Sequence, residues 1–452
     1  MSKRTIPSPL THSARLPAGR VARLARLGSL ATGVAGSMLA EGAKQWVKGE
    51  RPAMKDLLLT PNNAKRVAEQ LAQLRGAAMK VGQLLSMDAG DLLPKELSDI
   101  LARLRAEAKP MPLSQLSKVL EQQWGKGWHM QFKQFSFQPV AAASIGQVHS
   151  AYTKDGRHLA LKIQYPHIKE SIDSDVDNVA TLLRFSGLIP KTVDLKPLLI
   201  EAKRQLHDEA DYAREASWLL KYHQLLSDAS HFQLPDVYDD YSTEQVLAMS
   251  FVEGVPIESL SEASQADRNR VMGLLLDLLF KEIFVFRLIQ TDPNFANYQY
   301  NTTTKQLILL DFGATRVYPK KIAEGYRQLM QGAIEQDRTA MLAAAEQIGF
   351  FQAVIKADQR EAVIDVFQQA CEPLVKQGLY DFGRSDLASR IRDVGMRLSL
   401  EKDYWHTPPA DALFLHRKLG GLYLLAAKLN AQVDVNHLFQ PYFSTNTRQE
   451  KI

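Results

Sequence analysis

Three oxygen-bearing side chains in the second half of the chain could together hold a nucleotide and its metal ion. Asp292 and Asn297 are five residues apart, and an Asp-Phe-Gly triplet begins fourteen residues after Asn297, at Asp311. This spacing is typical of protein kinases, in which the first aspartate orients the attacking hydroxyl and the other two groups bind magnesium on the phosphates. The pattern predicts Asp292 as the catalytic carboxylate and Asn297 and Asp311 as metal ligands.

A lysine and a glutamate upstream are candidates for ordering the phosphates. Lys162 lies near the end of a short apolar run, where kinases place an ammonium against the α- and β-phosphates. A helix is predicted over residues 201–220, and Asp208, Asp211 and Glu215 share one of its faces. Like charges at that spacing destabilise a helix unless nearby cations neutralise them. Glu215 is therefore the candidate partner of Lys162. A solvated acidic face remains the alternative.

A strand near the middle of the chain could lead into an adenine-binding hinge. The run 246–254 is apolar and ends in a glycine. The backbone groups expected to contact adenine belong to Ser250, Phe251, Val252 and Glu253. Any edge strand could have this composition, so the assignment depends on the other motifs.

Two features differ from ordinary protein kinases. The phosphate-covering loop of a kinase is glycine-rich because glycine lets the backbone approach phosphate closely. This chain instead carries Ala141, Ala142, Ala143 and Ser144 there, which predicts a different nucleotide pose. After Asp311 the sequence passes into a helical pattern without the A-P-E segment of protein kinases. Both features disfavour a peptide substrate.

These departures, together with Lys80-Val81-Gly82-Gln83, make the chain resemble the UbiB family of atypical protein-kinase-like proteins, which is associated with ubiquinone biosynthesis. The resemblance extends from about residue 20 to residue 442 and includes a Leu415-His416-Arg417-Lys418 motif. The family motifs fall on Lys80, Gly82 and Gln83 (K-x-G-Q), on Ala141 to Ser144 (the alanine-rich loop) and on Glu209 and Asp211 (E-x-D).

The resemblance implies that N-terminal helices fold over the active site and exclude peptide substrates. It implies that Lys80 meets the acidic pair Glu209 and Asp211, and helical spacing gives Lys80 a face opposite the apolar stripe. The cofactors it implies are ATP and Mg²⁺. One departure is Gln290, which stands where many members carry histidine two residues before the aspartate, so a histidine-assisted mechanism is in doubt.

The elements that must position these residues indicate an α+β, bilobal protein-kinase-like fold with an N-terminal helical extension packed over the active site. Short β-like runs at 131–137, 146–152 and 159–164 precede helices over 198–226, and a strand is expected at 245–252. Helices dominate from residue 268, apart from a hairpin over 298–310. The predicted domains are a basic arm with a membrane-surface helix (1–48), a helical extension (49–120), an N-lobe (121–254) and a C-lobe (255–452).

Composition limits the remaining possibilities. Hydrophobic residues make up 45% and charged residues 23% of 452, which is ordinary for a globular protein. The first 26 residues carry six Lys or Arg and no acid, and no aromatic residue precedes Trp46, so nucleic acid is not the expected partner. An organellar presequence, a membrane-surface helix and a solvated arm all fit this segment. The single cysteine, Cys371, is expected to be a buried thiol.

The expected function is that of an atypical kinase-like ATPase supporting ubiquinone or other isoprenoid-lipid biosynthesis at a membrane surface. An ATP-binding regulatory scaffold and a small-molecule or lipid kinase are the alternatives. The expected partners are membrane lipids and quinone-biosynthesis enzymes, with a possible homodimer. The expected location is the cytoplasmic membrane surface in a bacterium or the matrix face of the inner membrane in a mitochondrion.

Overall fold

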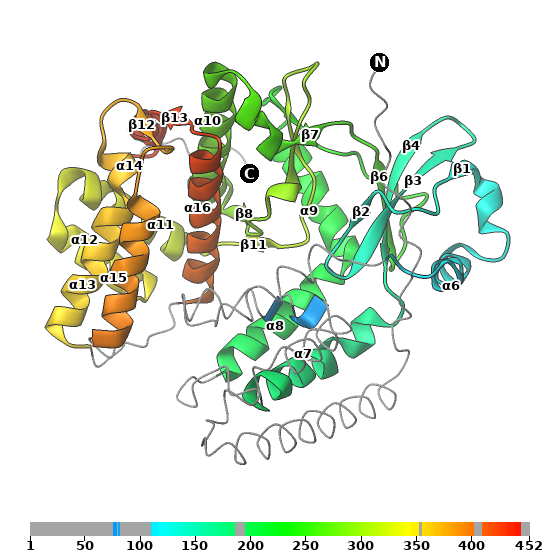
Figure 1. The fold of residues 1–452 in the computed structure, drawn as a ribbon, viewed down its shortest axis with the longest axis horizontal. Helices are drawn as coiled ribbons and strands as arrows, with labels where there is room; N and C mark the ends of the chain where they lie inside the picture. The colour runs from blue at the N-terminus through cyan, green and yellow to red at the C-terminus, as the bar shows by residue number, and fades with distance from the viewer. Residues whose placement is uncertain are drawn as a thin grey trace, which may run out of the picture. The chain divides into compact units, whose positions relative to one another are not determined.

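A computed structural model describes residues 76–78, 80–81, 110–185, 195–351, 355–401 and 409–443, without the side chains of 182, 183, 185 and 395–401. The chain forms two units, coloured along the sequence in Figure 1. The first holds the described residues up to Ala213 together with Asp236–Phe251, and the second holds Arg214–Pro235 together with the described residues from Val252 onward. Gly82, Gln83 and the predicted basic arm lie outside the described residues.

The first unit contains an antiparallel sheet in the order β1-β3-β4-β6, with β2 added against β3. Its strands are β1 (Phe132–Phe135), β2 (Ala141–Ala142), β3 (Gly146–Thr153), β4 (His158–Gln164) and β6 (Val246–Ser250). The predicted hairpin between β3 and β4 is confirmed, and its turn residue Gly156 has φ +91°, a value that glycine adopts without strain. Leu159, Leu161 and Ile163 of β4 are fully buried in the core.

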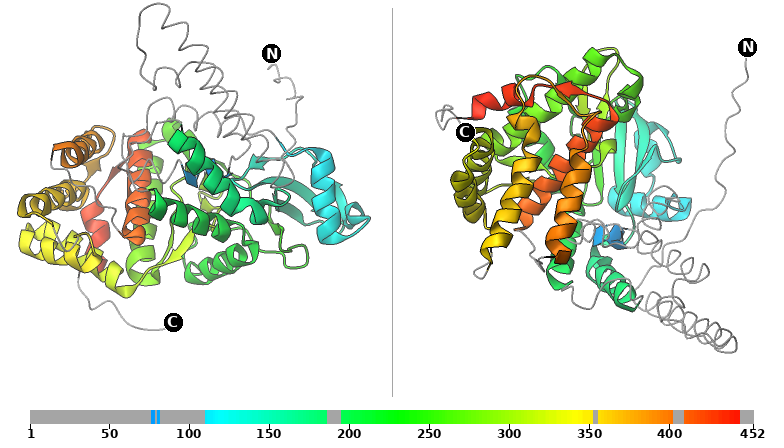
Figure 2. Two further views of the ribbon diagram at one scale, coloured as in Figure 1. Left: turned by 90° about the horizontal axis from the view of Figure 1, so that it is seen from below. Right: turned by 60° about the vertical axis from the view of Figure 1, so that its left-hand side comes forward.

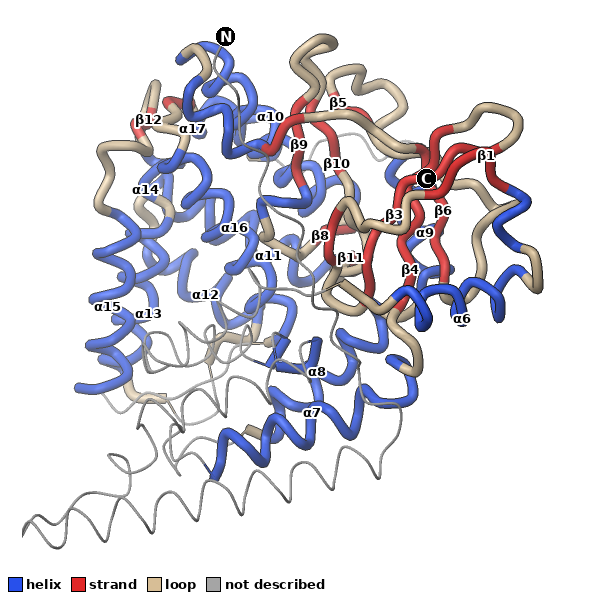
Figure 3. Tube along the Cα trace, turned by 45° about the vertical axis from the view of Figure 1, so that its right-hand side comes forward, coloured by secondary structure: helices blue, strands red, loops and turns tan. Residues whose placement is uncertain are grey.

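The described part of the first unit also contains helices. They are α6 (Leu113–Trp124), the 3₁₀ turn η2 (Trp128–Gln131), α7 (Ile168–Phe185), α8 (Lys196–Glu209) and the start of α9 (Tyr212–Leu225). In Figure 3, α7 and α8 lie side by side, and these two helices pack against each other. The sequence interpretation missed α7, although Ile172, Val176 and Val179 are buried at the spacing of one helical face.

The single helix predicted over 201–220 is wrong, because α8 ends at Glu209 and α9 begins at Tyr212. Gln164 of β4 donates its side-chain amide to the carbonyl of Ala210 at 2.8 Å. That carbonyl is bonded to the sheet at the point where the two helices part. Asp208 therefore lies in α8, Asp211 between the two helices and Glu215 in α9, so the three acids do not share one helical face.

Two small sheets of the second unit lie next to the candidate site residues in sequence. The first has the order β5-β10-β9-β7, and β11 pairs antiparallel with β8 in the second. Their strands are β5 (Phe232–Gln233), β7 (Val255–Pro256), β8 (Leu288–Gln290), β9 (Tyr298–Tyr300), β10 (Leu307–Leu309) and β11 (Thr315–Val317). The predicted hairpin over 298–310 is confirmed as β9 and β10, paired antiparallel.

The rest of the second unit is mainly helical, as Figure 2 shows for α11 to α16. The helices are α10 (Gln265–Lys281), α11 (Lys320–Glu335), α12 (Arg338–Ile348), α13 (Ala357–Ala370), α14 (Glu372–Val375), α15 (Leu387–Glu401), α16 (Ala410–Lys428) and α17 (Val435–Phe439). Shorter elements are η3 (Ile257–Glu262), the π-helical η4 (Glu282–Phe286), η5 (Phe295–Asn297), η6 (Gln440–Tyr442) and the pair β12 (Tyr380–Asp381) and β13 (Gln432–Val433).

Two single residues of the second unit are a buried thiol and a helix cap. Cys371 is a buried free thiol, as predicted, and burial raises its pKa to about 12. Ser264 caps α10 by accepting a hydrogen bond from the backbone N–H of Asp267 at 3.1 Å. That helix and the other described helices all fall short of the length and apolarity that a membrane span requires.

Candidate active site

The catalytic loop begins where β8 ends and is fastened to the segment after the Asp-Phe-Gly triplet. Thr291 donates both its backbone N–H, at 3.2 Å, and its hydroxyl, at 2.7 Å, to the carbonyl of Ala314. The pairing of β8 with β11 continues this connection, with Gln290 opposite Thr315. Two segments more than twenty residues apart in sequence are thus held together by the backbone.

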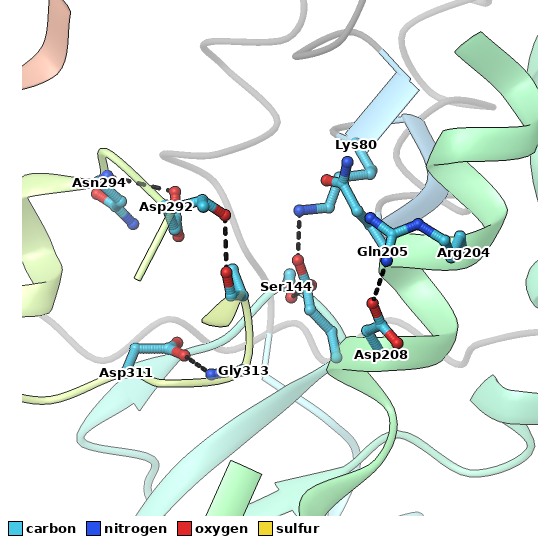
Figure 4. A network of polar contacts seen from close by, with 12 residues as sticks. Lys80, Ser144, Arg204, Gln205, Asp208, Asp292, Asn294, Asp311 and Gly313 are labelled. Atoms are coloured by element: carbon cyan, nitrogen blue, oxygen red, sulfur yellow. Dashed lines mark hydrogen bonds and ion pairs between the residues drawn. The ribbon is translucent and has the colours of Figure 1, made fainter. Parts of the chain in front are cut away.

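The Asp292 carboxylate accepts hydrogen bonds from other residues of its own loop, as Figure 4 shows for Asn294. One oxygen of its carboxylate, Oδ2, accepts a hydrogen bond from the Asn297 amide at 3.1 Å, and the other, Oδ1, accepts the backbone N–H of Asn294 at 3.3 Å. The side chain is 26% exposed. The carboxylate is therefore held in one orientation while it stays accessible to a nucleophile.

Asn297 and Asp311 come together through the β9–β10 hairpin. The backbone N–H of Leu310, the residue before Asp311, donates to the carbonyl of Asn297 at 3.0 Å. Asp311 Oδ1 accepts the N–H of Gly313 at 3.0 Å, which fixes the Asp-Phe-Gly turn. Asn297 uses its amide nitrogen for Asp292, so its amide oxygen is the atom it can offer to a cation.

This donor set fits a hard divalent cation that is completed by phosphate oxygens. One carboxylate and one amide oxygen are few ligands, and magnesium in nucleotide sites usually takes one or two carboxylates plus substrate phosphates and water. Among the described residues, no three His, Cys, Asp or Glu side chains gather as a metal site of their own. The residues therefore fit a metal that arrives with the nucleotide.

Glu215 lies against the Asp-Phe-Gly turn within the second unit. It is only 2% exposed, and a Cβ added at Gly313 would lie 3.3 Å from Glu215 Oε2 and 3.3 Å from Asp311 Oδ1. Glycine at this position therefore permits a close approach of the turn to two carboxylates. The neighbouring Arg214 donates to the carbonyl of Thr315 at 2.9 Å, so the start of α9 is bonded to β11.

Lys162 belongs to the first unit, whereas Glu215 belongs to the second. Lys162 stands in β4 between Val148 of β3 and Leu247 of β6, is 8% exposed, and holds its ammonium 5.4 Å from the ring centroid of Tyr212. A lysine so placed on a buried strand has the form expected of a phosphate ligand. Its pairing with Glu215 stays a prediction.

The alanine-rich loop and Lys80 meet at one carboxylate in the first unit. Glu209 accepts a hydrogen bond from the hydroxyl of Ser144 at 2.6 Å and forms an ion pair with Lys80. A Cβ added at Gly76 would lie 3.2 Å from the carbonyl oxygen of Ser144, so the helix that carries Lys80 also approaches the loop closely. Figure 4 shows Lys80 and Ser144 in this arrangement. Asp211, the second acid of the motif, is exposed.

The proposed hinge is more constrained than its sequence suggests. The backbone N–H of Ser250 donates to the carbonyl of Asp236 at 2.8 Å, and the N–H of Phe251 donates to the carbonyl of His158 at 2.9 Å. These two donors are therefore engaged inside the first unit. An adenine ring bound here would take its N–H donor from Val252 or Glu253.

The sequence interpretation missed a buried charge cluster beneath the catalytic loop. Glu282 accepts hydrogen bonds from Lys418 at 2.5 Å, from the Tyr222 hydroxyl at 2.6 Å and from the backbone N–H of Gln290 at 3.3 Å. Burial, and then the nearby charge of Glu282, raises the pKa of Tyr222 well above its ordinary value, so its hydroxyl stays a donor. The signal available in the sequence was that Glu282 and Lys418 are charged residues inside otherwise apolar runs.

The chain is similar to proteins of one named family. The family model for the ABC1 atypical kinase-like domain matches residues 103–345. The Saccharomyces cerevisiae protein named atypical kinase COQ8, mitochondrial, is 38% identical over 436 residues, which cover 96% of this chain and 86% of that protein. Rattus norvegicus atypical kinase COQ8B, mitochondrial, is 36% identical over 94% of this chain and 81% of its own length.

A solved structure shares the fold. A Mycobacterium tuberculosis protein, determined in complex with erythromycin, superposes with a TM-score of 0.58 at 25% sequence identity. The match covers 84% of this chain and 96% of that one. The α+β, kinase-like architecture expected from the sequence is thus found in a known structure.

Proposed function

Because the chain belongs to the ABC1 family of atypical kinase-like proteins, also called UbiB, we propose that it is a Mg²⁺- and ATP-dependent ATPase or phosphotransferase serving ubiquinone biosynthesis. The observation that carries the proposal is the catalytic loop. Asp292, with both carboxylate oxygens oriented by the loop itself, stands beside Asn297 and is fastened to the Asp311 turn. A protein that only bound nucleotide would not need this oriented carboxylate.

Each residue has a role in transferring the γ-phosphoryl group. Asp292 orients the attacking hydroxyl, of water or of a lipid, and takes up its proton. Asn297 and Asp311 would hold Mg²⁺, which supplies charge neutralisation on the phosphates when bound. Lys162 orders the α- and β-phosphates, with Glu215 as its partner.

Two observations support a small acceptor rather than a peptide. Glu209 binds both Lys80 and Ser144, so the segment before the sheet is joined to the phosphate-covering loop. After β11, only Tyr318 and Pro319 precede α11, which leaves no room for a long peptide-docking segment. The acceptor is therefore water or a small or lipid-borne hydroxyl.

Location and partners follow from the same proposal. Relatives of this chain carry the word mitochondrial in their names, so we place the protein in mitochondria, or at the cytoplasmic membrane surface if its source is bacterial. We propose peripheral contact with membrane lipids and with quinone-biosynthesis enzymes, a possible homodimer, and no nucleic-acid partner. The basic, acid-free start of the chain supports contact with anionic lipid.

A second candidate function is an ATP-binding regulatory scaffold. The observation that favours it is the hydrogen bond from Ser144 to Glu209, which holds the phosphate-covering loop in one conformation. In such a scaffold the nucleotide would change that arrangement, and turnover would be incidental.

Phosphate release separates the two functions. The full chain is incubated with Mg²⁺ and ATP, with and without anionic vesicles, and compared with Asp292→Asn and Asp311→Asn. We expect Asp292→Asn to lower release by about 100-fold or more while nucleotide still binds, because only the general base is lost. Asp311→Asn should also weaken Mg²⁺-dependent binding. The matched control is Asp386→Asn, whose carboxylate is 74% exposed and pairs with Arg390.

Equal phosphate release from all four proteins would defeat the ATPase proposal and leave the scaffold. Unchanged Mg²⁺-dependent nucleotide binding in Asp311→Asn would defeat the metal role of that residue.

A further inference from the structure

One face of α16 is directed at the catalytic loop. Arg417, Lys418 and Gly421, within one turn of this helix, each contact or approach the loop and its support. A Cβ added at Gly421 would lie only 2.5 Å from Cβ of Pro293, so the helix backbone packs directly on the residue after Asp292. Lys418 anchors the same face through Glu282. Helix α16 is thus packed against the loop that carries Asp292 and is anchored there by the Lys418–Glu282 ion pair.

Arg417 places a permanent positive charge at the catalytic carboxylate. Its Nη2 atom is 4.0 Å from Asp292 Oδ1, and its side chain is 12% exposed. The catalytic loop, residues 290–297, contains no lysine or arginine of its own. A guanidinium stays charged at any physiological pH and presents several N–H donors in a fork that matches phosphate oxygens.

Arg417 forms a long ion pair with Asp292, a carboxylate that the loop already orients. At 4.0 Å this nitrogen is beyond hydrogen-bond range of Asp292 Oδ1, whose orientation is already fixed by Asn294 and Asn297. An ammonium or guanidinium at this distance from the general base is within reach of the phosphoryl group that the nucleophile attacks. Phosphoryl transfer spreads negative charge over three oxygens, and a positioned arginine stabilises that charge.

We propose that Arg417 is a further catalytic residue, which binds the γ-phosphoryl group of ATP and stabilises its charge during transfer; this inference rests on the proposed function. In hydrolysis, the oxygen of water bonds to the γ-phosphorus while the bond from that phosphorus to the β,γ-bridging oxygen breaks. The electron pair of that bond stays on ADP. The proton of water passes to Asp292 and then to solvent, and the products are ADP and inorganic phosphate.

Nucleotide affinity gives a test that does not require turnover. Arg417→Gln and Arg417→Lys are titrated with Mg²⁺ and either ADP or the non-hydrolysable ATP analogue with a β,γ-imido bridge. Loss of a charge-assisted hydrogen bond to the γ-phosphate should weaken binding of the analogue by about 10-fold or more in Arg417→Gln and leave ADP affinity unchanged. Phosphate release should fall by about 100-fold. Arg417→Lys should recover part of both.

Arg384→Gln is the matched control, because this arginine lies in the same unit, is 90% exposed and is far along the sequence from the loop. It should match wild type in both affinities. Equal weakening of the analogue and ADP, or no weakening of either, would overturn the proposal, and the second result would leave Arg417 as a positioning residue only. If Arg417→Gln fails to fold, Arg417→Lys carries the same comparison. If wild type releases no phosphate, the hydrolase proposal fails. The affinities for ADP and for the analogue still show whether Arg417 binds the γ-phosphate.

Discussion

Glu282 carries a buried negative charge, and burying it is tolerated only because Lys418 and Tyr222 bind its carboxylate. Its side chain is 1% exposed, that of Lys418 is 4% exposed, and the pair supports the strand that leads into the catalytic loop. Charges removed from water cost several kcal/mol each, and the loss is offset only while both partners remain. At the scale of single residues, this pair supports the loop from below through the backbone N–H of Gln290.

Removing one member of that pair should cost far more than removing both charges. We expect Lys418→Met to lower the free energy of unfolding by about 3–5 kcal/mol, because Glu282 is then buried without its cation. The double variant Glu282→Gln with Lys418→Met should recover much of this loss. Chemical denaturation measures both, with Lys428→Met as control, since Lys428 is 51% exposed on the same helix. Additive effects of the two substitutions would contradict the account.

At the scale of elements, two adjacent glycines of α16 have opposite surroundings. A Cβ at Gly421 would lie 2.5 Å from Pro293, whereas a Cβ at Gly420 would meet no atom within 4 Å. Gly421→Ala should therefore displace the catalytic loop, lower stability by about 1–3 kcal/mol and reduce phosphate release. Gly420→Ala should instead raise stability by about 0.5–1 kcal/mol, because alanine favours the helix. Thermal unfolding and phosphate-release assays of the two variants give the comparison, and similar outcomes would contradict it.

Local signals explain which elements the sequence predicted. The β3–β4 hairpin was predicted because the turn Asp155-Gly156 joins two short β-like runs, and the predicted β9–β10 hairpin is also present. The break between α8 and α9 was missed, and the side chain that binds the chain there, Gln164, is 46 residues from Ala210. Arg417 was recognised only as part of a motif, since 125 residues separate it from Asp292. Contacts of this kind become visible only when the chain is folded.

At the scale of the whole molecule, the chain passes between the two units three times within its described part, at residues 213, 235 and 251. Helix α9 begins in the first unit and continues in the second, where it carries Glu215. Neither unit is therefore a continuous stretch of sequence. The E-x-D motif lies just before this crossing: Glu209, which binds Lys80 and Ser144, is the last residue of α8, and Asp211 directly precedes α9.

Removing Lys80 should loosen the attachment of the N-terminal segment to the phosphate-covering loop. Lys80 is 8% and Glu209 15% exposed, so Lys80→Gln leaves a mostly buried carboxylate that has lost its cation and keeps the hydrogen bond from the Ser144 hydroxyl. We expect the free energy of unfolding to fall by about 1–3 kcal/mol. Lys169→Gln is the control, because the ion pair of Lys169 with Glu244 is exposed and such pairs contribute about 0–1 kcal/mol. Equal losses in chemical denaturation would mean that the Lys80 ion pair holds the segment no more firmly than a surface contact does.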